Sequence, residues 1–318
     1  MKLKIPVLCI LIPSFNESES FDFCLNNLSK ILTKLINEKK IAKNSYLYFV
    51  DDGSTDDSWK KILKKSKDLS FVKGVRLYKN VGHQNALLYG IKKNIDKCCI
   101  SISIDADLQQ DPNKIPLFVE SYINGYDIVM GVRNNRKTDS FFKKNSANLF
   151  YWFMKLFKLN LKKNHADYRL LSNKAMNYVL RYPSYNIFLR FVTNDIGLPK
   201  KIIYFDVTER SFGSTKYSFS KMFFLAMNSI TTYSVFPLRC IFMLGLFFFI
   251  FSFFMIIYIL ISKYILLGSV PGWASILLPI YLLGGLILMS LGVIAEYIGQ
   301  LYFSQNRQPK FYEEDELV

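Results

Sequence analysis

The chain has 318 residues, of which 51% are hydrophobic and 16% aromatic, and it carries a formal net charge of +16 at pH 7. The length allows one large domain or two smaller ones with a full core, and the hydrophobic content is high for a soluble protein. The excess of hydrophobic residues lies after residue 235, where it indicates membrane segments. The positive charge therefore favours binding of anionic lipid headgroups and phosphorylated substrates over binding of nucleic acid. Five cysteines without metal-ligand spacing indicate free thiols in a reducing compartment.

The first 235 residues alternate between short apolar runs and longer helical patterns. The run that ends at Pro13 is short and interrupted by prolines, so we interpret it as a first strand instead of a signal peptide. The alternation predicts an α/β fold with a mostly parallel, doubly wound sheet. The expected strands are "PVLCILIP", "YLYFV", "FVKGVRLY", "CCISISI" and "DIVMGV", and two of the expected helices are "FDFCLNNLSKILTKLINEKK" and "GHQNALLYGIKKNI".

Polar clusters follow four of these strands. In open α/β sheets, ligands bind beyond the carboxyl ends of the strands, so we expect these clusters to meet at one rim and form a binding site. The clusters are "PSFNES", "DDGSTDD", "DADLQQD" and "GVRNNR".

Two aspartates one residue apart, Asp105 and Asp107, close a buried strand. A divalent cation would relieve their repulsion, and the hard oxygens of Asp107 and Gln109 suit Mg²⁺ or Mn²⁺. An isolated Asp-x-Asp also occurs in ordinary surface loops, but the preceding apolar run favours the metal. Asp51 and Asp52 close another strand, where they could bind a base or ribose, or serve only as turn and helix-cap residues.

The region after residue 216 is predicted to contact a membrane. Residues 217–237 are amphipathic and predict an interfacial helix, or alternatively a surface helix packed on the domain. Two apolar segments, about 238–262 and 274–297, each contain nearly 20 uncharged residues in a row and are about 30 Å or more long as helices, which is enough to span a bilayer. Basic residues flank the pair, so domain 1–216 and tail 299–318 should face the cytoplasm. The acidic end "EEDEL" is expected to be solvated.

The ordered motifs carry a resemblance that covers nearly the whole chain. In this order, and followed by the two apolar segments, they resemble family 2 glycosyltransferases, and within them the polyprenyl-phosphate sugar transferases. This resemblance implies a GT-A fold and inverting transfer of one sugar, such as glucose from UDP-glucose, to undecaprenyl or another polyprenyl phosphate. The motifs are "IPSFNE", "VDDGSTD", "NVGHQNALLYG", "DADLQQDP", "GVRNNR", "DYRLL" and "GSTKYS".

The resemblance also implies roles for individual residues. Asp167 matches a proposed base, which Arg169 could support, although a helix cap is an alternative for Asp167 and a structural ion pair for Arg133. Thr215 stands where such enzymes carry serine in a Ser-Lys-Tyr motif, and it keeps the hydroxyl group. The implied donor contacts are Pro13, Asn16, Glu17, Asp51, Asp52 and Asp105; the metal and diphosphate contacts are Asp105, Asp107 and Gln109; the acceptor-phosphate contacts are Arg133, Arg136, Lys144 and Lys216.

Alternative functions remain open at this point. A processive polysaccharide synthase would normally carry Gln-x-x-Arg-Trp, and none of the three tryptophans is preceded by arginine. A membrane-tethered nucleotide-sugar binder would not need the aspartate pair, and a channel is disfavoured by spans without charge.

The two histidines are far apart in the sequence, so His83 and His165 do not predict a metal site, although His83 could touch the donor. Small residues such as Gly284 and Gly285 could pack helices together in a homo-oligomer.

Overall fold

The computed structural model describes residues 5–134, 165–182, 188–207, 273–305 and 313–317, with isolated positions between 238 and 257. The chain divides into two compact units. The first comprises residues 1–152, 160–218 and 308–318, and the second comprises residues 153–159 and 219–307. Several predicted features lie outside the described residues: Arg136, Lys144, Lys216, the interfacial helix 217–237 and most of the first apolar segment.

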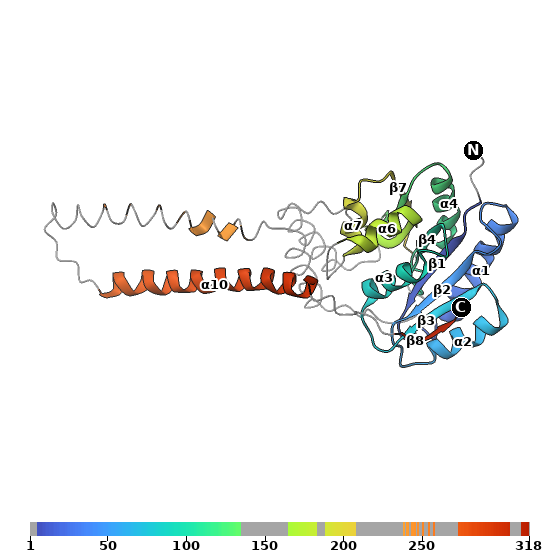
Figure 1. The fold of residues 1–318 in the computed structure, drawn as a ribbon, viewed down its shortest axis with the longest axis horizontal. Coiled ribbons are helices and arrows are strands. Elements are labelled where there is room, and N and C mark those ends of the chain that lie inside the picture. Colours follow the sequence, from blue (N-terminus) through green and yellow to red (C-terminus); the bar gives the residue numbers. More distant parts are fainter. Residues whose placement is uncertain are drawn as a thin grey trace. The chain divides into compact units, whose positions relative to one another are not determined.

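The first unit is built on one eight-stranded sheet with the order β7-β5-β6-β4-β1-β2-β3-β8 (Figure 1). Strands β1 to β4 are parallel to one another: β1 pairs with β2 and β4, and β2 pairs with β3. Strand β5 pairs in parallel with β7. This confirms the predicted α/β class and the mostly parallel sheet. The strands are β1 (Leu8–Ser14), β2 (Tyr46–Asp51), β3 (Val72–Leu77), β4 (Ile100–Ser103), β5 (Ile128–Arg133), β6 (His165–Ser172), β7 (Lys200–Phe205) and β8 (Glu313–Leu317).

Helices cover both faces of the sheet, because the central strands are apolar on both sides and must be buried twice. Cys24 and Leu28 of α1 belong to the main core, together with Ile10 of β1 on the same face. On the other face, Gly90 of α3 lies so close to Leu11 that an added Cβ would come within 2.3 Å of a leucine methyl carbon. The helices of this unit are α1 (Phe21–Asn37), α2 (Ser58–Asp68), α3 (His83–Asn94), α4 (Ile115–Ile123), α6 (Asn173–Arg181) and α7 (Leu189–Asp195).

Two strands depart from the sequence-based expectations. Strand β6 lies between β4 and β5 and is antiparallel to both, with Ser103 opposite Arg169. Asp167 therefore lies in a strand, and the alternative that it caps a helix is wrong. The acidic end of the chain forms β8, which pairs antiparallel with β3. Glu313, Glu314 and Asp315 are exposed, as expected for a solvated end, but the segment is a paired strand whose carboxylates form ion pairs with basic side chains of the domain.

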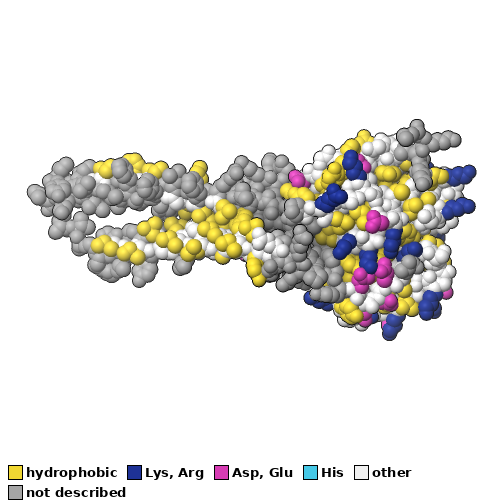
Figure 2. Space-filling model, in the orientation of Figure 1, with side chains coloured by type: hydrophobic (Ala, Val, Ile, Leu, Met, Phe, Trp, Pro, Cys, Tyr) yellow, Lys and Arg dark blue, Asp and Glu magenta, His cyan; other side chains and the backbone are white. Residues whose placement is uncertain are grey.

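In the second unit, helix α10 (Trp273–Gln305) has 33 residues. Apolar side chains such as Ile276, Ile287 and Met289 are more than half exposed along it (Figure 2). Within the described ranges, we find no helix whose length and hydropathy suffice for crossing a membrane.

Candidate active site

The polar clusters meet at one edge of the sheet. Strands β1, β2, β4 and β5 all end there, as expected for parallel strands. Strand β6 runs in the opposite direction, so its first residues reach the same edge. Since Ser103 pairs with Arg169, Asp167 is carried to the level at which β4 gives way to Asp105. The fold thus brings Asp105 and Asp167 together although they are far apart in sequence.

The loop after β4 is held by a side chain that the sequence did not single out. Gln110 is 1% exposed; its amide nitrogen donates to Asp105 Oδ2 at 2.5 Å, and its amide oxygen accepts from the backbone of Asp105 at 2.7 Å. The turn requires a positive φ of 48° at Leu108. It also directs the backbone N–H of Gln109 to Asp107 Oδ1, 3.2 Å away. Asp105 and Asp107 are therefore fixed in one tight loop.

His83, the first residue of α3, lies between two carboxylates. Its Nε2 atom is 3.6 Å from Asp105 Oδ1 and 3.8 Å from Asp167 Oδ2. This places His83 at the helix start, as the sequence predicts, and also inside the site. Burial raises the pKa of Asp105, with opposing contributions from the nearby charges of His83 and Arg133. Arg133, at the end of β5, is thus close enough to influence Asp105 electrostatically.

Asp167 is the centre of an ion-pair cluster. Arg169, two residues along the same strand face, donates to Asp167 Oδ1, and Arg190 of α7 donates to Oδ2 at 2.6 Å and to Oδ1 at 3.3 Å. Burial opposes ionisation of Asp167, but the charges of Arg190 and Arg169 outweigh it and hold its pKa well below the usual range. A carboxylate with so low a pKa is a weak proton acceptor.

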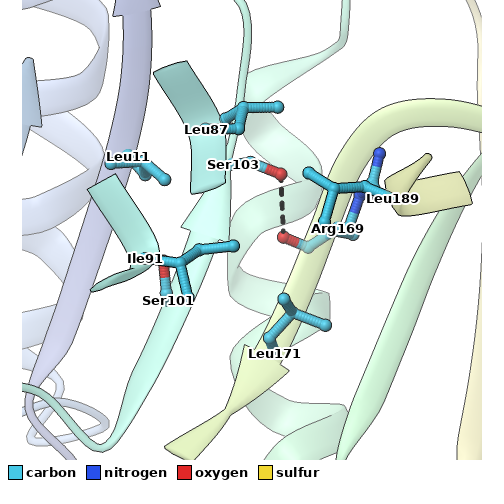
Figure 3. A pocket seen from close by; sticks show the side chains of 8 residues that line it. All are labelled: Leu11, Leu87, Ile91, Ser101, Ser103, Arg169, Leu171 and Leu189. Carbon is cyan, nitrogen blue, oxygen red and sulfur yellow. Dashed lines mark hydrogen bonds between the residues drawn. The ribbon is translucent and has the colours of Figure 1, made fainter. Parts of the chain in front are cut away.

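The Arg169 side chain is 1% exposed and lines a small internal cavity, walled by leucines from β1, α3, β6 and α7 (Figure 3). Its Nε and Nη1 atoms are buried and have no hydrogen-bond partner among the described residues. Ser103 Oγ donates to the Asp167 carbonyl at 2.8 Å and ties β4 to β6 at this point. Arg169 is therefore a buried charge whose compensation depends on Asp167.

The loops after β1 and β2 are joined by hydrogen bonds. Asn16, with a φ of 54°, accepts from the Thr55 backbone at 2.8 Å, and its own N–H donates to Ser54 Oγ at 2.9 Å. The Glu17 N–H donates to Ser58 Oγ, also at 2.9 Å. The polar groups of "PSFNES" and "DDGSTDD" thus have a structural role in addition to any contact with a ligand.

Asp51 and Asp52 lie at the end of β2 and are 0% and 3% exposed. Asp52 accepts from the backbone N–H groups of Val81 and Gly82 at 2.7 and 3.0 Å. Asp51 Oδ2 accepts from the Ser54 N–H, whereas Asp51 Oδ1 is buried without a hydrogen-bond partner in the described part of the chain. Such an atom is costly unless a ligand reaches it.

Asp52 should make the stability depend on pH. Burial raises its pKa to about 6 from an ordinary value of 3.8, so between these values the folded protein keeps a proton that the unfolded chain has lost. As the pH rises from 4 to 6, the wild type should therefore lose up to about 3 kcal/mol relative to Asp52→Asn, which does not titrate. Urea unfolding of both proteins at pH 4.5 and 7 measures this difference; a difference that stays constant contradicts the assignment.

The carboxylates at the end of β4 suit a cation whose remaining ligands come from the substrate. Among the described residues, no group of three or more His, Cys, Asp or Glu side chains is placed to hold a metal ion. Mg²⁺, however, is usually bound by one or two carboxylates, water and substrate phosphates. Asp105 Oδ1 is buried and has no hydrogen-bond partner among the described residues, and Asp107 belongs to the same loop. This pair of donors fits such an ion.

The structure gathers most of the predicted residues that it describes. Asp105, Asp107, Asp167 and Arg133 form one cluster, and Asp51 and Asp52 lie at the end of β2, which β1 separates from β4. The sequence reasoning missed Gln110 and Arg190, and treated His83 as a marginal candidate. "GHQ" at the start of a helix that follows a strand was the signal available for His83; no local pattern distinguishes Gln110 or Arg190.

Comparison with known proteins identifies relatives over nearly the full length of the chain. The family model described as Glycosyl transferase family 2 matches residues 9–193. An uncharacterized glycosyltransferase, YkoT of Bacillus subtilis, is 43% identical over 98% of this chain and 92% of its own length. The putative glycosyltransferase CsbB of the same organism is 33% identical over 97% and 92%. A bactoprenol glucosyl transferase of Shigella phage SfX is 29% identical over 95% of this chain and 97% of its own.

Proposed function

This chain belongs to glycosyl transferase family 2 and is a glycosyltransferase with a GT-A-like α/β fold, and we propose that it transfers one sugar from a nucleotide-sugar to a polyprenyl phosphate. The observation that carries the acceptor is the similarity to the bactoprenol glucosyl transferase, which extends over 95% of the chain. The similarity therefore includes the region after the family 2 segment, where a lipid acceptor would be approached. We propose UDP-glucose, or a related nucleotide-sugar, as the donor.

The proposed donor site lies at the ends of β1 and β2. Asp51 Oδ1, buried without a hydrogen-bond partner among the described residues, is placed to accept from the base or ribose. Asp52 holds the Val81–Gly82 backbone that leads into α3, and so fixes the wall of the site. Pro13, Asn16 and Glu17 complete this wall through the cross-linked loops.

The proposed acceptor site uses guanidinium groups, whose planar fork fits phosphate oxygens. Arg133 projects from the end of β5, and we propose Arg136, Lys144 and Lys216 as further contacts from the sequence alone. Arg190 is 35% exposed while it holds Asp167, so it can also meet an anion at the mouth of the site. Asp167 then acts mainly by positioning arginines, since its low pKa disfavours proton abstraction.

The reaction forms a bond from an acceptor phosphate oxygen to the anomeric carbon and breaks the bond from that carbon to the nucleoside diphosphate, with inversion. Asp105, Asp107 and Gln109 would hold a bound Mg²⁺ or Mn²⁺, which would neutralise charge on the departing diphosphate. The acceptor phosphate is already an anion at neutral pH, so the chain's own residues contribute chiefly by orienting the two substrates.

We further propose that the enzyme is held at the cytoplasmic face of the cytoplasmic membrane. The apolar sequence of residues 238–298 and the exposed apolar side chains of α10 support membrane attachment. The excess of Lys and Arg around this segment supports a cytoplasmic catalytic domain with both termini on the same side. Carbonate extraction and reporter fusions at either end test this location; a periplasmic terminus would contradict it.

A donor screen tests the function. Membranes that contain the full chain are incubated with undecaprenyl phosphate and each of several labelled nucleotide-sugars, and the lipid fraction is analysed by mass spectrometry. We expect one sugar added to the lipid phosphate with one donor. Longer glycans would identify a processive synthase, and nucleotide-sugar binding without transfer from any donor would identify a non-catalytic binding subunit.

A further inference from the structure

The acidic strand β8 contacts the domain at a specific point. Glu314 lies beside Arg76 of β3: its Oε2 atom is 3.2 Å from Arg76 Nε, and its Oε1 atom is 3.4 Å from Arg76 Nη1. The pairing of the two strands is irregular at Arg76 and Leu77, where the register shifts. Arg76 is therefore held by a carboxylate from a segment 238 residues away in sequence.

The same arginine reaches the proposed nucleoside site. Arg76 Nη2 donates to the Ser54 carbonyl at 3.2 Å, and Arg76 Nε lies 3.6 Å from Asp51 Oδ2. These contacts fix the turn at Gly53, which has a φ of 67° and leaves no room for a Cβ beside Lys79. Asp51 Oδ2 thus has the Ser54 N–H and the Arg76 charge beside it, whereas Asp51 Oδ1 is buried without a hydrogen-bond partner among the described residues.

A second set of ion pairs keeps β8 in place. Lys93 of α3 lies 2.7 Å from Glu313 and 2.8 Å from Glu316, and Lys97 lies 3.5 Å from Glu316. Helix α3 begins with His83, which lies in the cluster at Asp105 and Asp167. Strand β8 thus bridges β3 and α3, two elements that flank the site.

We propose that β8 positions the donor site, with Glu314 and Arg76 acting as positioning residues for Asp51. This inference rests on the proposed function, in that Asp51 contacts the nucleoside. Glu314 restrains the guanidinium, the guanidinium restrains Asp51 and the Ser54 carbonyl, and the restrained carboxylate recognises the nucleoside of the donor. Arg76 and Glu314 do not touch the donor themselves, so their loss should weaken nucleotide binding and leave the rate of transfer at saturating donor nearly unchanged.

The test uses the full chain in detergent, with UDP and GDP as probes in titration calorimetry. Glu314→Gln should weaken binding of the preferred nucleotide about fivefold, the upper range for a partly exposed ion pair. Arg76→Gln should weaken it about tenfold, because the contacts to Asp51 and Ser54 are lost together. Asp315→Asn is the matched control: it makes the same change of charge on the same strand, and Asp315 forms no ion pair with any residue that the structure describes. Its affinity should stay within about twofold of the wild type.

A double-mutant cycle separates positioning from a general loss of structure. If Glu314 acts through Arg76, the double variant should bind no more weakly than Arg76→Gln alone. With the identified donor, KM should rise while kcat stays nearly unchanged, and Arg76→Lys should restore part of the affinity. Unchanged nucleotide binding in Glu314→Gln, or strictly additive losses, would overturn the positioning role alone. Failure of the wild type to bind either nucleotide would overturn the nucleoside site and this role with it.

Discussion

Replacing Asp167 by alanine should destabilise the catalytic domain by about 3 to 5 kcal/mol, because it leaves a buried guanidinium without its counter-ion. Arg169 is 1% exposed, and Asp167 is its ion-pair partner. Two nitrogen atoms of Arg169 already lack hydrogen bonds among the described residues, so no nearby acceptor there is positioned to replace Asp167. Urea unfolding of the full chain in detergent measures the loss through the shift of the transition midpoint.

Two comparisons make this result specific. Asp57→Asn removes the same charge from an exposed pair with Lys60 and should change the stability by no more than about 0.5 kcal/mol. Asp167→Leu combined with Arg169→Met removes both buried charges and should recover much of the stability lost in Asp167→Ala. If Asp167→Ala is as stable as the wild type, Arg169 must have another partner, and the ion-pair account of this cluster is wrong.

Replacing Asp107 by asparagine should abolish sugar transfer, with a loss of at least about a thousandfold in kcat/KM. Asparagine keeps the shape of the side chain and can still accept from the Gln109 N–H, but it removes the negative charge that would hold a divalent cation at the diphosphate. The share of the protein recovered with the membrane fraction and its thermal stability should both stay as in the wild type. The donor assay with mass spectrometry of the lipid product measures the loss.

Asp111→Asn is the matched control in the same loop. The Asp111 side chain accepts from the Asn113 backbone at the start of a short helical turn, a role that asparagine also fills well. This variant should keep activity within about threefold of the wild type, as expected for a surface change. Transfer by Asp107→Asn at more than a tenth of the wild-type rate would contradict the assignment of Asp107 to the metal.

The first five strands and the polar edge of the sheet could be predicted from the sequence, because each strand is a near-continuous apolar run that ends in a polar cluster, and this pattern is visible in neighbouring residues. The five expected strands are β1 to β5, and the polar residues that follow them lie on one edge. Strand β6 could not be predicted, since nothing in "HADYRLLS" states that it inserts antiparallel between β4 and β5. Strand β8 could not be predicted either, because an acidic pentapeptide has the composition of a solvated end.

The site was only partly predictable for the same reason. Asp105 and Asp107 are adjacent to a recognisable strand end, whereas Arg190 enters from α7 and Gln110 turns back from its own loop onto Asp105. These contacts depend on tertiary placement and not on local pattern. The low pKa of Asp167 likewise arises from two arginines, one of which is 23 residues away in the chain.

The pairing of β3 with β8 also constrains the order in which the molecule assembles. Closing a loop of more than two hundred residues carries a large entropic cost, so this ladder should form after the parallel strands β1 to β4 have docked. The apolar residues 238–298 lie inside that loop, so they should fold before β8 pairs with β3 at the edge of the sheet. Refolding experiments should therefore record nucleotide binding at the proposed donor site as a late event, slower than the appearance of secondary structure.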